Sequence, residues 1–322
     1  MRIAVIGAGL AGISFANALT ERATVSVFEK SRGIGGRMAT RYAGIYEFDH
    51  GAQYFTAREP AFRDALTPHI AAGRVAQWEG NIVKILPNGD AEPIAKTTPI
   101  YVASPRMNSL VKAMADGVDV ALQCQVTSVQ KDGEDWVLTD TDGRTYGPFD
   151  WVVSAAPAPQ TAALAPQTFE QMDVLQRVRM TGCFTLILGS ADGPEIDWNG
   201  AKVADGPIGW IAVNSDKPGR ETSPSLVVQT TNEWAEAHLE EDPDAVRRTI
   251  IDALLKITGI DAEACEHSAL HRWRYANTPE PAGSPFLIDP DLRFAACGDW
   301  CLGGRVEAAF MSGTALADAV TA

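Results

Sequence analysis

The sequence predicts an α/β protein that combines a Rossmann-type dinucleotide-binding domain with a second domain built on an antiparallel sheet. The first domain is predicted because the apolar run Arg2–Gly7 opens a glycine-rich turn and a second apolar run, Thr24–Phe28, ends at Glu29. Short β-branched runs separated by a helical stretch are typical of a buried parallel sheet. The second domain is predicted because strand-like segments follow one another between Gly-, Pro- and Asp-rich loops over residues 159–285, an order typical of antiparallel sheets.

The glycines of residues 7–12 fit the pattern G-x-G-x-x-G, and each has a separate physical role. Gly7 permits a tight turn, Gly9 lets a pyrophosphate approach the backbone, and Gly12 lets the helix pack closely on the strand. The start of that helix offers free N–H groups and the positive end of its dipole to phosphates. Glu29 follows Gly7 by 22 residues (29 − 7 = 22) and can accept hydrogen bonds from ribose hydroxyls. The order of these parts predicts a dinucleotide site.

A glycine-rich loop over residues 30–40 follows that acid and contains Arg32 and Arg37. Such a loop can pass close to a ligand, and guanidinium groups can bind phosphate oxygens through two hydrogen bonds. Its position directly after Glu29 favours a second clamp on the same dinucleotide over an ordinary basic loop.

The last forty residues are predicted to return to the same ligand. Leu292–Ala296 is strand-like, a turn follows with Asp299, and Gly303-Gly304 precedes a predicted helix over Val306–Val320. The carboxylate can accept hydrogen bonds from hydroxyl groups, and the helix N-terminus can stabilise negative charge.

Composition excludes several classes of function. The chain has 322 residues, is 46% hydrophobic and carries a formal charge of −14, which argues against nucleic acids and anionic membranes as partners. No apolar run is long enough to span a bilayer, and the first residues already form a predicted strand, so we expect neither a membrane segment nor a signal peptide. The five scattered cysteines contain no C-x-x-C pair, which favours free thiols in the cytoplasm and no metal site.

Taken in order, these motifs resemble the FAD-binding amine oxidase superfamily. Within it, residues 31–38 followed by 49–56 are similar to the renalase family, as are residues 271–276 and 297–313. The resemblance covers nearly the whole chain and is weakest over 160–265. It implies FAD, bound non-covalently, as the cofactor.

The resemblance also implies a p-hydroxybenzoate hydroxylase-like, two-domain architecture. We expect a discontinuous FAD-binding domain of residues 1–58, 98–158 and 285–322, and a substrate domain of residues 59–97 and 159–284. The residues expected to bind FAD are Gly7, Ala8, Gly9, Leu10, Ala11, Gly12, Glu29, Lys30, Arg32, Gly36, Arg37, Met38, Gln53, Val126, Asp299, Arg305, Val306 and Glu307.

Renalases oxidise isomers of NAD(P)H that are reduced at the 2- or 6-position of the nicotinamide ring. They form NAD(P)+, and O2 is reduced to H2O2. The resemblance therefore implies dihydronicotinamide dinucleotides and O2 as the small molecules that this chain uses. It does not fix the preference for NAD or NADP isomers or the oligomeric state, monomer or dimer.

The expected substrate-facing residues come from three segments. Strand alternation over residues 271–275 puts His271, Trp273 and Tyr275 on one side and the two arginines on the other. Trp234 and His238 stand four residues apart on a predicted helix and therefore share one face, although plain packing explains such a pair more often than a substrate site does. The full set of candidates is Gln53, Tyr54, Trp234, His238, His271, Trp273 and Tyr275.

Two other functions remain open at this stage. One is a flavin amine oxidase or desaturase of the wider superfamily. The other is a non-catalytic FAD-binding redox sensor, since no catalytic triad or paired-acid motif stands out. Hydride transfer to a flavin needs no protein nucleophile, so both an oxidase and a sensor are compatible with that finding.

Overall fold

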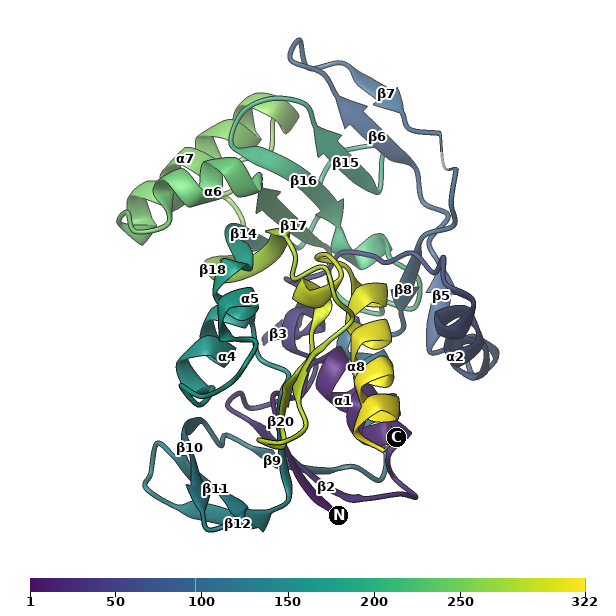
Figure 1. Ribbon diagram of the computed structural model, residues 1–322. Helices are drawn as coiled ribbons and strands as arrows, with labels where there is room; N and C mark the ends of the chain where they lie inside the picture. The colour runs from purple at the N-terminus through teal and green to yellow at the C-terminus, as the bar shows by residue number, and fades with distance from the viewer. Residues whose placement is uncertain (96, 322) are drawn as a thin grey trace.

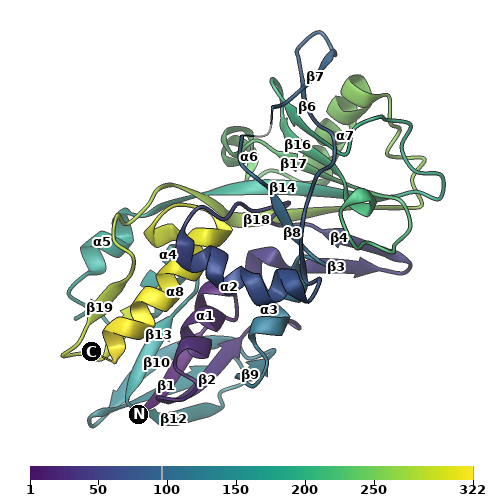
Figure 2. The same ribbon diagram turned by 90° about the vertical axis from the view of Figure 1, so that its right-hand side faces the viewer.

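Two large β-sheets form the framework of the protein in the computed structural model, which describes residues 1–95 and 97–321. One sheet lies near both termini, and the other lies at the opposite end of the molecule (Figure 1). A view turned by 90° shows the long strands β14 and β18 running from the first region to the second (Figure 2).

The first sheet has six strands and confirms the predicted Rossmann-like half. Its strands are parallel except at one edge, where β19 runs antiparallel to β20. Their order is β19 (Leu287–Asp289), β20 (Phe294–Ala296), β13 (Trp151–Ser154), β1 (Arg2–Ile6), β2 (Thr24–Glu29) and β9 (Asp119–Leu122).

Both faces of this sheet are covered, which explains the continuous apolar runs in the sequence. Ile3 and Val5 contribute to the cluster that includes α1 (Leu10–Ala18), α3 (Asn108–Met114) and α8 (Val306–Val320). Ala4 and Ile6 contribute to the cluster on the other face. That face is covered by β10 (Val126–Asp132), β11 (Asp135–Asp140), β12 (Thr145–Phe149), α4 (Ala158–Leu164) and α5 (Met172–Arg177).

The second sheet has seven strands and confirms the predicted antiparallel sheet. Every neighbouring pair is antiparallel except β15 with β6. The order is β18 (His267–Glu280), β14 (Arg179–Gly189), β17 (Ser225–Thr230), β16 (Ile208–Val213), β15 (Gly200–Val203), β6 (Ile82–Ile85) and β7 (Ala91–Pro93). Helices α6 (Asn232–His238) and α7 (Pro243–Thr258) cover its outer face.

A hairpin that the sequence did not reveal covers part of the inner face. It consists of β3 (Thr40–Ala43) and β4 (Tyr46–Asp49), and Tyr46 and Phe48 pack against Ile187 and Val227 of the sheet. The remaining elements are η1 (Gly36–Met38), α2 (Pro60–Ala71), β5 (Val75–Gln77), β8 (Tyr101–Ala103), η2 (Asn214–Asp216) and η3 (Asp299–Cys301).

The domain boundaries stay a prediction. Strands β5 and β8 pair with each other although they were expected on opposite sides of the boundary at residue 98. Within the described residues, no helix combines the length and apolar character that crossing a membrane requires.

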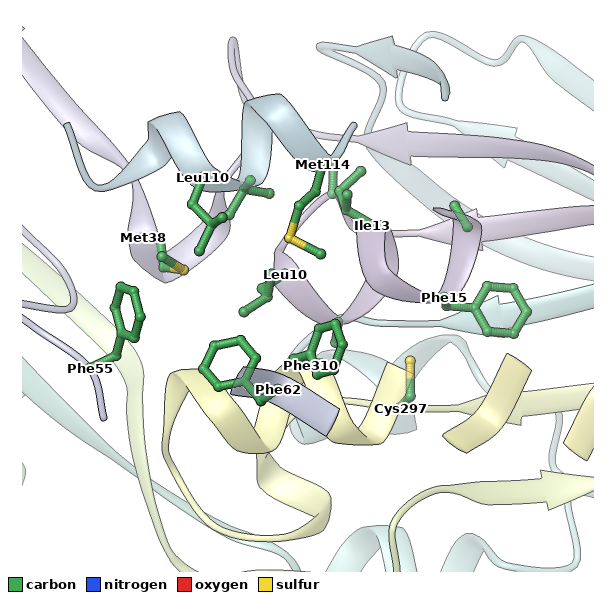
Figure 3. Packing of buried hydrophobic residues seen from close by; sticks show 14 of the residues in the cluster. Leu10, Ile13, Phe15, Met38, Phe55, Phe62, Leu110, Met114, Cys297 and Phe310 are labelled. Carbon is green, nitrogen blue, oxygen red and sulfur yellow. The ribbon is translucent and has the colours of Figure 1, made fainter. Parts of the chain in front are cut away.

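Helices α1 and α8 approach so closely that their contact requires glycine. A Cβ atom at Gly313 would lie 2.2 Å from the carbonyl oxygen of Ala11. Figure 3 shows the packing beside this contact, where the Phe310 ring of α8 lies 5.1 Å from that of Phe62. The position of α1, and with it the glycine-rich turn, therefore depends on α8.

Replacing Gly313 with alanine should lower the free energy of unfolding by about 1–3 kcal/mol, because the added methyl group meets backbone atoms that cannot rotate away. Thermal denaturation of the purified variant measures this. Asp318→Ala, at an exposed position of the same helix, is the control and should change the midpoint little. A midpoint for Gly313→Ala equal to that of the control would contradict the contact.

Candidate dinucleotide and substrate site

The glycine-rich turn brings three backbone segments together. Gly7 has φ +110°, and a Cβ atom at Gly12 would lie 2.1 Å from the Gly7 carbonyl oxygen. Gly9 forms a bridge with Gly35, and a Cβ atom at Gly36 would lie 3.2 Å from the Gly9 Cα atom. Gly36 has φ +53°, and the tight contact that a Cβ atom there would make favours glycine where the turn and the loop after β2 meet.

Helix α1 begins beside these glycines with free donors. Its N-cap residue, Gly9, makes no side-chain cap, and its first turn contains no acid. Leu10 and Ala11 therefore occupy the helix start, where backbone N–H groups lack intrahelical partners. An uncapped N-terminus beside backbone-only surfaces suits the phosphates of a dinucleotide.

Glu29 is buried at the end of β2 and ties the two loops together. Its Oε2 accepts a hydrogen bond from the backbone N–H of Ala8 at 2.9 Å, and its Oε1 accepts one from Ser31 at 2.8 Å. Each carboxylate oxygen retains a lone pair after these bonds. The residue expected to bind ribose hydroxyls thus also fixes the turn that is expected to bind the phosphates.

Arg37 and Asp299, which the sequence assigns to two parts of the same ligand, lie in contact. Arg37 Nη1 donates to Asp299 Oδ2 at 2.9 Å, and Nη2 donates to Oδ1. The pair brings the loop after β2 next to η3 and the start of α8. Arg37 Nη1 also lies 3.4 Å from the carbonyl oxygen of Ala276 in β18, so this position adjoins the second sheet.

The other residues expected to bind the cofactor have varied surroundings. Met38 and Val126 are buried in the two clusters of the first sheet, and Figure 3 shows Met38 near Phe55. Lys30 and Arg32 are exposed, and Lys30 donates to Gln160 at 3.3 Å.

The N-terminus of α8 was expected to stabilise negative charge on the ligand, but its first turn carries an acid that is bound elsewhere in the protein. Arg305 is its N-cap residue and Val306 its first residue. Glu307 is buried, and its Oε1 accepts hydrogen bonds from the backbone N–H groups of Arg58 and Glu59, at 2.5 and 2.7 Å. The Glu307 carboxylate is therefore occupied at the start of α2.

A short segment, Asp49–Gln53, connects the two halves of the site. A Cβ atom at Gly51 would lie 2.0 Å from the Arg37 carbonyl oxygen, so only glycine fits. From the second sheet, Gln229 Nε2 donates to the Gly51 carbonyl at 2.7 Å, and Trp273 Nε1 donates to the His50 carbonyl at 2.9 Å. The segment thus lies between the cofactor loop and the inner face of the second sheet.

Two buried cations hold the beginning of this segment. Asp49 Oδ2 lies 2.6 Å from Arg220 Nη2 and 3.6 Å from Lys217 Nζ, and the side chains of Asp49 and Lys217 are 1% and 0% exposed. Asp49 Oδ1 accepts from the Thr40 hydroxyl and the Met107 backbone, at 2.8 and 3.0 Å. Burial alone would raise the pKa of Asp49, but the two cations and the hydrogen bonds from Arg220 and the Met107 backbone lower it.

The same lysine holds Gln53. Lys217 Nζ donates to Gln53 Oε1 at 3.1 Å and to Asn214 Oδ1 at 3.0 Å, while Gln53 Nε2 donates to the carbonyls of Asp49 and Gly51 at 2.5 and 3.0 Å. Burial lowers the pKa of Lys217 to about 8, against the opposing effect of Asp49. The predicted residue Gln53 is therefore fixed at both ends of its amide.

His271 and Trp273 form an aromatic wall together with His50. The His50 ring centroid lies 4.8 Å from that of His271 and 5.0 Å from that of Trp273, and the latter two are 4.4 Å apart. Burial, with His271 and Arg41 nearby, lowers the pKa of His50 to about 4, and burial also lowers the pKa of His271. The wall is uncharged at neutral pH.

Tyr54 lies in a second aromatic group, next to Gln53. Its ring lies 5.3 Å from Trp210 and 6.4 Å from Trp78. The structure therefore places the two aromatic groups at the two ends of the short segment around Gly51.

The structure separates Tyr275 from the wall. A register shift in the pairing of β18 with β14 falls between Trp273 and Asn277, so strict alternation ends after Trp273. Tyr275 packs instead against the cluster on the other face of the first sheet, which includes Trp300.

Trp234 and His238 also do not join the other candidates. Their rings stack at 4.1 Å on α6, and Trp234 packs on Phe184, which faces the helix-covered side of the second sheet. Four-residue spacing put the pair on one helical face correctly, but that face packs on the outer side of the sheet. The substrate role expected for these two residues is not supported by their position.

Sequence reasoning missed Lys217, Arg220 and Trp210 at the site. Lys217 and Arg220 stand in a Pro- and Gly-containing loop without a motif, and only burial beside Asp49 reveals them. The available signal was the alternation in β16, which puts Trp210 and Ala212 on one face.

Comparison with known proteins bears on the family and the fold of the chain. A family model described as flavin containing amine oxidoreductase matches residues 85–321, and one described as an NAD(P)-binding Rossmann-like domain matches residues 5–67. The curated renalase of Mus musculus is 27% identical over 331 residues, covering 92% of this chain and 92% of that protein.

Solved structures show the same fold. A putative protoporphyrinogen oxidase from Exiguobacterium sp. 255-15 has a TM-score of 0.77 at 12% identity, covering 99% of this chain and 98% of that one. A putrescine oxidase variant with redesigned cofactor binding has a TM-score of 0.72 at 13% identity, with coverage of 99% and 98%.

Replacing Asp49 with asparagine should destabilise the fold by about 3–5 kcal/mol, because Lys217 and Arg220 would remain buried without a counter-ion. Urea denaturation at pH 7 measures the loss. The control, Glu240→Gln, breaks the ion pair with Arg274 on the surface and should have little effect.

The same substitution should also change the response to acid. Because the folded pKa of Asp49 is below 3.8, its contribution to stability is present above pH 3.8 and is lost as the pH falls through the folded pKa. Asp49→Asn lacks this contribution at every pH, so its deficit relative to the natural protein should shrink in strong acid. A deficit that stays constant down to unfolding would contradict the assignment.

Proposed function

Because the chain belongs to the flavin-containing amine oxidoreductase family and is a renalase-like member of it, we propose that this FAD-dependent oxidoreductase oxidises 2- and 6-dihydro isomers of NAD(P)H. The balanced reaction is dihydronicotinamide dinucleotide plus H+ and O2 to NAD(P)+ and H2O2. The substrate loses a hydride, and O2 takes up two electrons and two protons.

The residues present fit FAD, which is bound non-covalently. The backbone-only surfaces at Gly9 and Gly36, together with the uncapped start of α1, would hold its pyrophosphate. Glu29 would hold a ribose, and Arg37 and Asp299 would hold the part of the cofactor nearest the second sheet. When bound, FAD supplies the two-electron redox chemistry.

The uncharged aromatic wall is the observation that carries the substrate proposal. His50, His271 and Trp273 offer flat, neutral surfaces on which a dihydronicotinamide ring can stack. Within the segment beside the wall, Asp49 is already neutralised by two cations and does not offer a free carboxylate to an ammonium group. These features favour a neutral ring over a charged amine as the oxidised group.

The chain's own contribution to this reaction is binding and orientation. Gln53, held by Lys217 and by two backbone carbonyls, keeps a fixed position beside the wall. Because a hydride donor of this class needs no base, the neutral imidazoles of the wall serve as surfaces and hydrogen-bonding groups.

A flavin amine oxidase is the second candidate, and the description of the matched family favours it. We also propose that the protein acts in the cytoplasm, because its five cysteines are free thiols, as expected in a reducing compartment.

The cofactor site can be tested with Gly9→Val. A branched side chain at this position would point toward Gly36 and fill the space between the two loops, so the purified variant should contain no FAD. Absorbance of the natural protein should show FAD that acid precipitation releases into the supernatant. Gly33→Val is the matched control, since a Cβ atom at Gly33 meets no atom within 4 Å, and it should retain FAD. Full occupancy in Gly9→Val would contradict the site.

The substrate can be tested by anaerobic stopped-flow absorbance. Isomers reduced at position 2 or 6 should bleach the bound flavin quickly, whereas NADH and simple amines should do so slowly, because the fixed wall presents one edge of the ring for reaction. Rapid reduction by amines without a response to the isomers would favour the amine oxidase instead.

Trp273→Ala should slow that reduction by about 10-fold or more without loss of FAD, since it removes part of the wall and the hydrogen bond to His50. Trp234→Ala is the control: it removes a tryptophan of α6, which packs on the opposite face of the second sheet, and should leave the rate unchanged. Equal rates in the two variants would show that the wall does not contact the substrate.

A further inference from the structure

Arg41 lies beside the aromatic wall on the hairpin that covers the second sheet. In the β3–β4 pairing it stands opposite Phe48, and residues paired in this way share a face. Phe48 stacks on His267 of β18, with ring centroids 5.5 Å apart. The Arg41 side chain therefore projects from the hairpin toward β18.

Three histidines surround this arginine. His267 and His271 are two alternations apart on β18 and share its inner face, and His50 lies against His271. Burial lowers the pKa of each of the three, and the positive charge of Arg41 lowers it further, for His50 after the larger effect of His271, as expected for a guanidinium close to them.

Arg41 has no acidic partner among the described residues. The guanidinium groups of Arg37, Arg106, Arg220, Arg247 and Arg274 all pair with carboxylates, whereas half-buried Arg41 forms neither an ion pair nor a side-chain hydrogen bond with any described residue. His267 Nε2 is likewise buried without a hydrogen-bond partner in the described part of the chain. A partly desolvated cation beside an unused imidazole nitrogen is suited to an anion.

Arg41 and His267 lie further along β18 than the aromatic wall does. A strand rises about 3.3 Å per residue, so His271 lies about 7 Å and His267 about 20 Å along the strand from Trp273. A dinucleotide whose nicotinamide ring contacts the wall can extend along β18, and its ribose and phosphates would then follow in the direction of Arg41.

We propose that Arg41, His267 and His271 form the subsite that binds the phosphates of the dinucleotide substrate, a proposal that rests on the function inferred above. The planar guanidinium can donate two parallel hydrogen bonds to phosphate oxygens, and a neutral imidazole can donate one. Because the chain carries a formal charge of −14, an anionic substrate depends on such a local site and not on the overall field.

The experiment compares two reductants by anaerobic stopped flow: 6-dihydro-NAD, and the corresponding dihydronicotinamide riboside, which has no phosphate. In Arg41→Ala the apparent Kd for the dinucleotide should rise about 10- to 100-fold, as expected for losing charge-assisted hydrogen bonds, while the limiting rate stays the same. Results with the riboside should not change. Arg41→Lys should recover part of the affinity, and Arg248→Ala, an exposed arginine on α7, should behave like the natural protein.

A second measurement separates this inference from the proposed function. Titration calorimetry with inorganic pyrophosphate should detect binding to the FAD-loaded natural protein and to Arg248→Ala, but not to Arg41→Ala. If no dihydronicotinamide reduces the flavin while pyrophosphate binding still depends on Arg41, the proposed substrate is wrong and the anion subsite stands. If Arg41→Ala binds both the dinucleotide and pyrophosphate as the natural protein does, the subsite is wrong.

Discussion

The buried carboxylate of Asp49 is the interaction on which the site depends. It joins three parts of the chain: the hairpin through Thr40, the start of α3 through Met107, and the loop after β16 through Lys217 and Arg220. These parts belong to segments far apart in the sequence, and removal of one charge would leave the others uncompensated in the interior. The segment after Asp49 therefore has one position relative to both sheets.

From that fixed point the site is built largely from backbone contacts. Gly51 meets the carbonyl of Arg37, and the sheet supplies side-chain donors from Gln229 and Trp273 to neighbouring carbonyls. The aromatic wall is thus tied to the same segment that contacts the cofactor loop. The surface proposed for a substrate ring and the site proposed for a dinucleotide cofactor share one short stretch of backbone.

The parts that the sequence predicted depend on local chemistry. The glycine turn, the acid after β2 and the small residues of α8 are each required at a fixed spacing in the chain, so the sequence alone predicts them. Residues that come together only in the folded protein could not be predicted in this way. Lys217 and Arg220 carry no motif, and the bulge that turns Tyr275 away from the wall depends on how β18 pairs with β14.

Alternation and helical spacing had similar limits. They identified shared faces correctly for His271 with Trp273 and for Trp234 with His238. They could not tell which face of the second sheet is covered by helices, because that depends on where α6 and α7 pack. The hairpin of β3 and β4 was missed for a related reason, since Phe48 is buried by a distant sheet.

Glu307 gives the α8 start an unexpected property. Its carboxylate lies in the first turn of one helix and accepts hydrogen bonds at the start of another, α2. Two helix N-termini carry partial positive charges, and like poles placed together repel each other. A single acid shared between them acts as a common counter-charge, and the Phe62–Phe310 contact lies just beyond it. The two helices are consequently coupled electrostatically, and a neutral residue at this position would set their positive ends against each other.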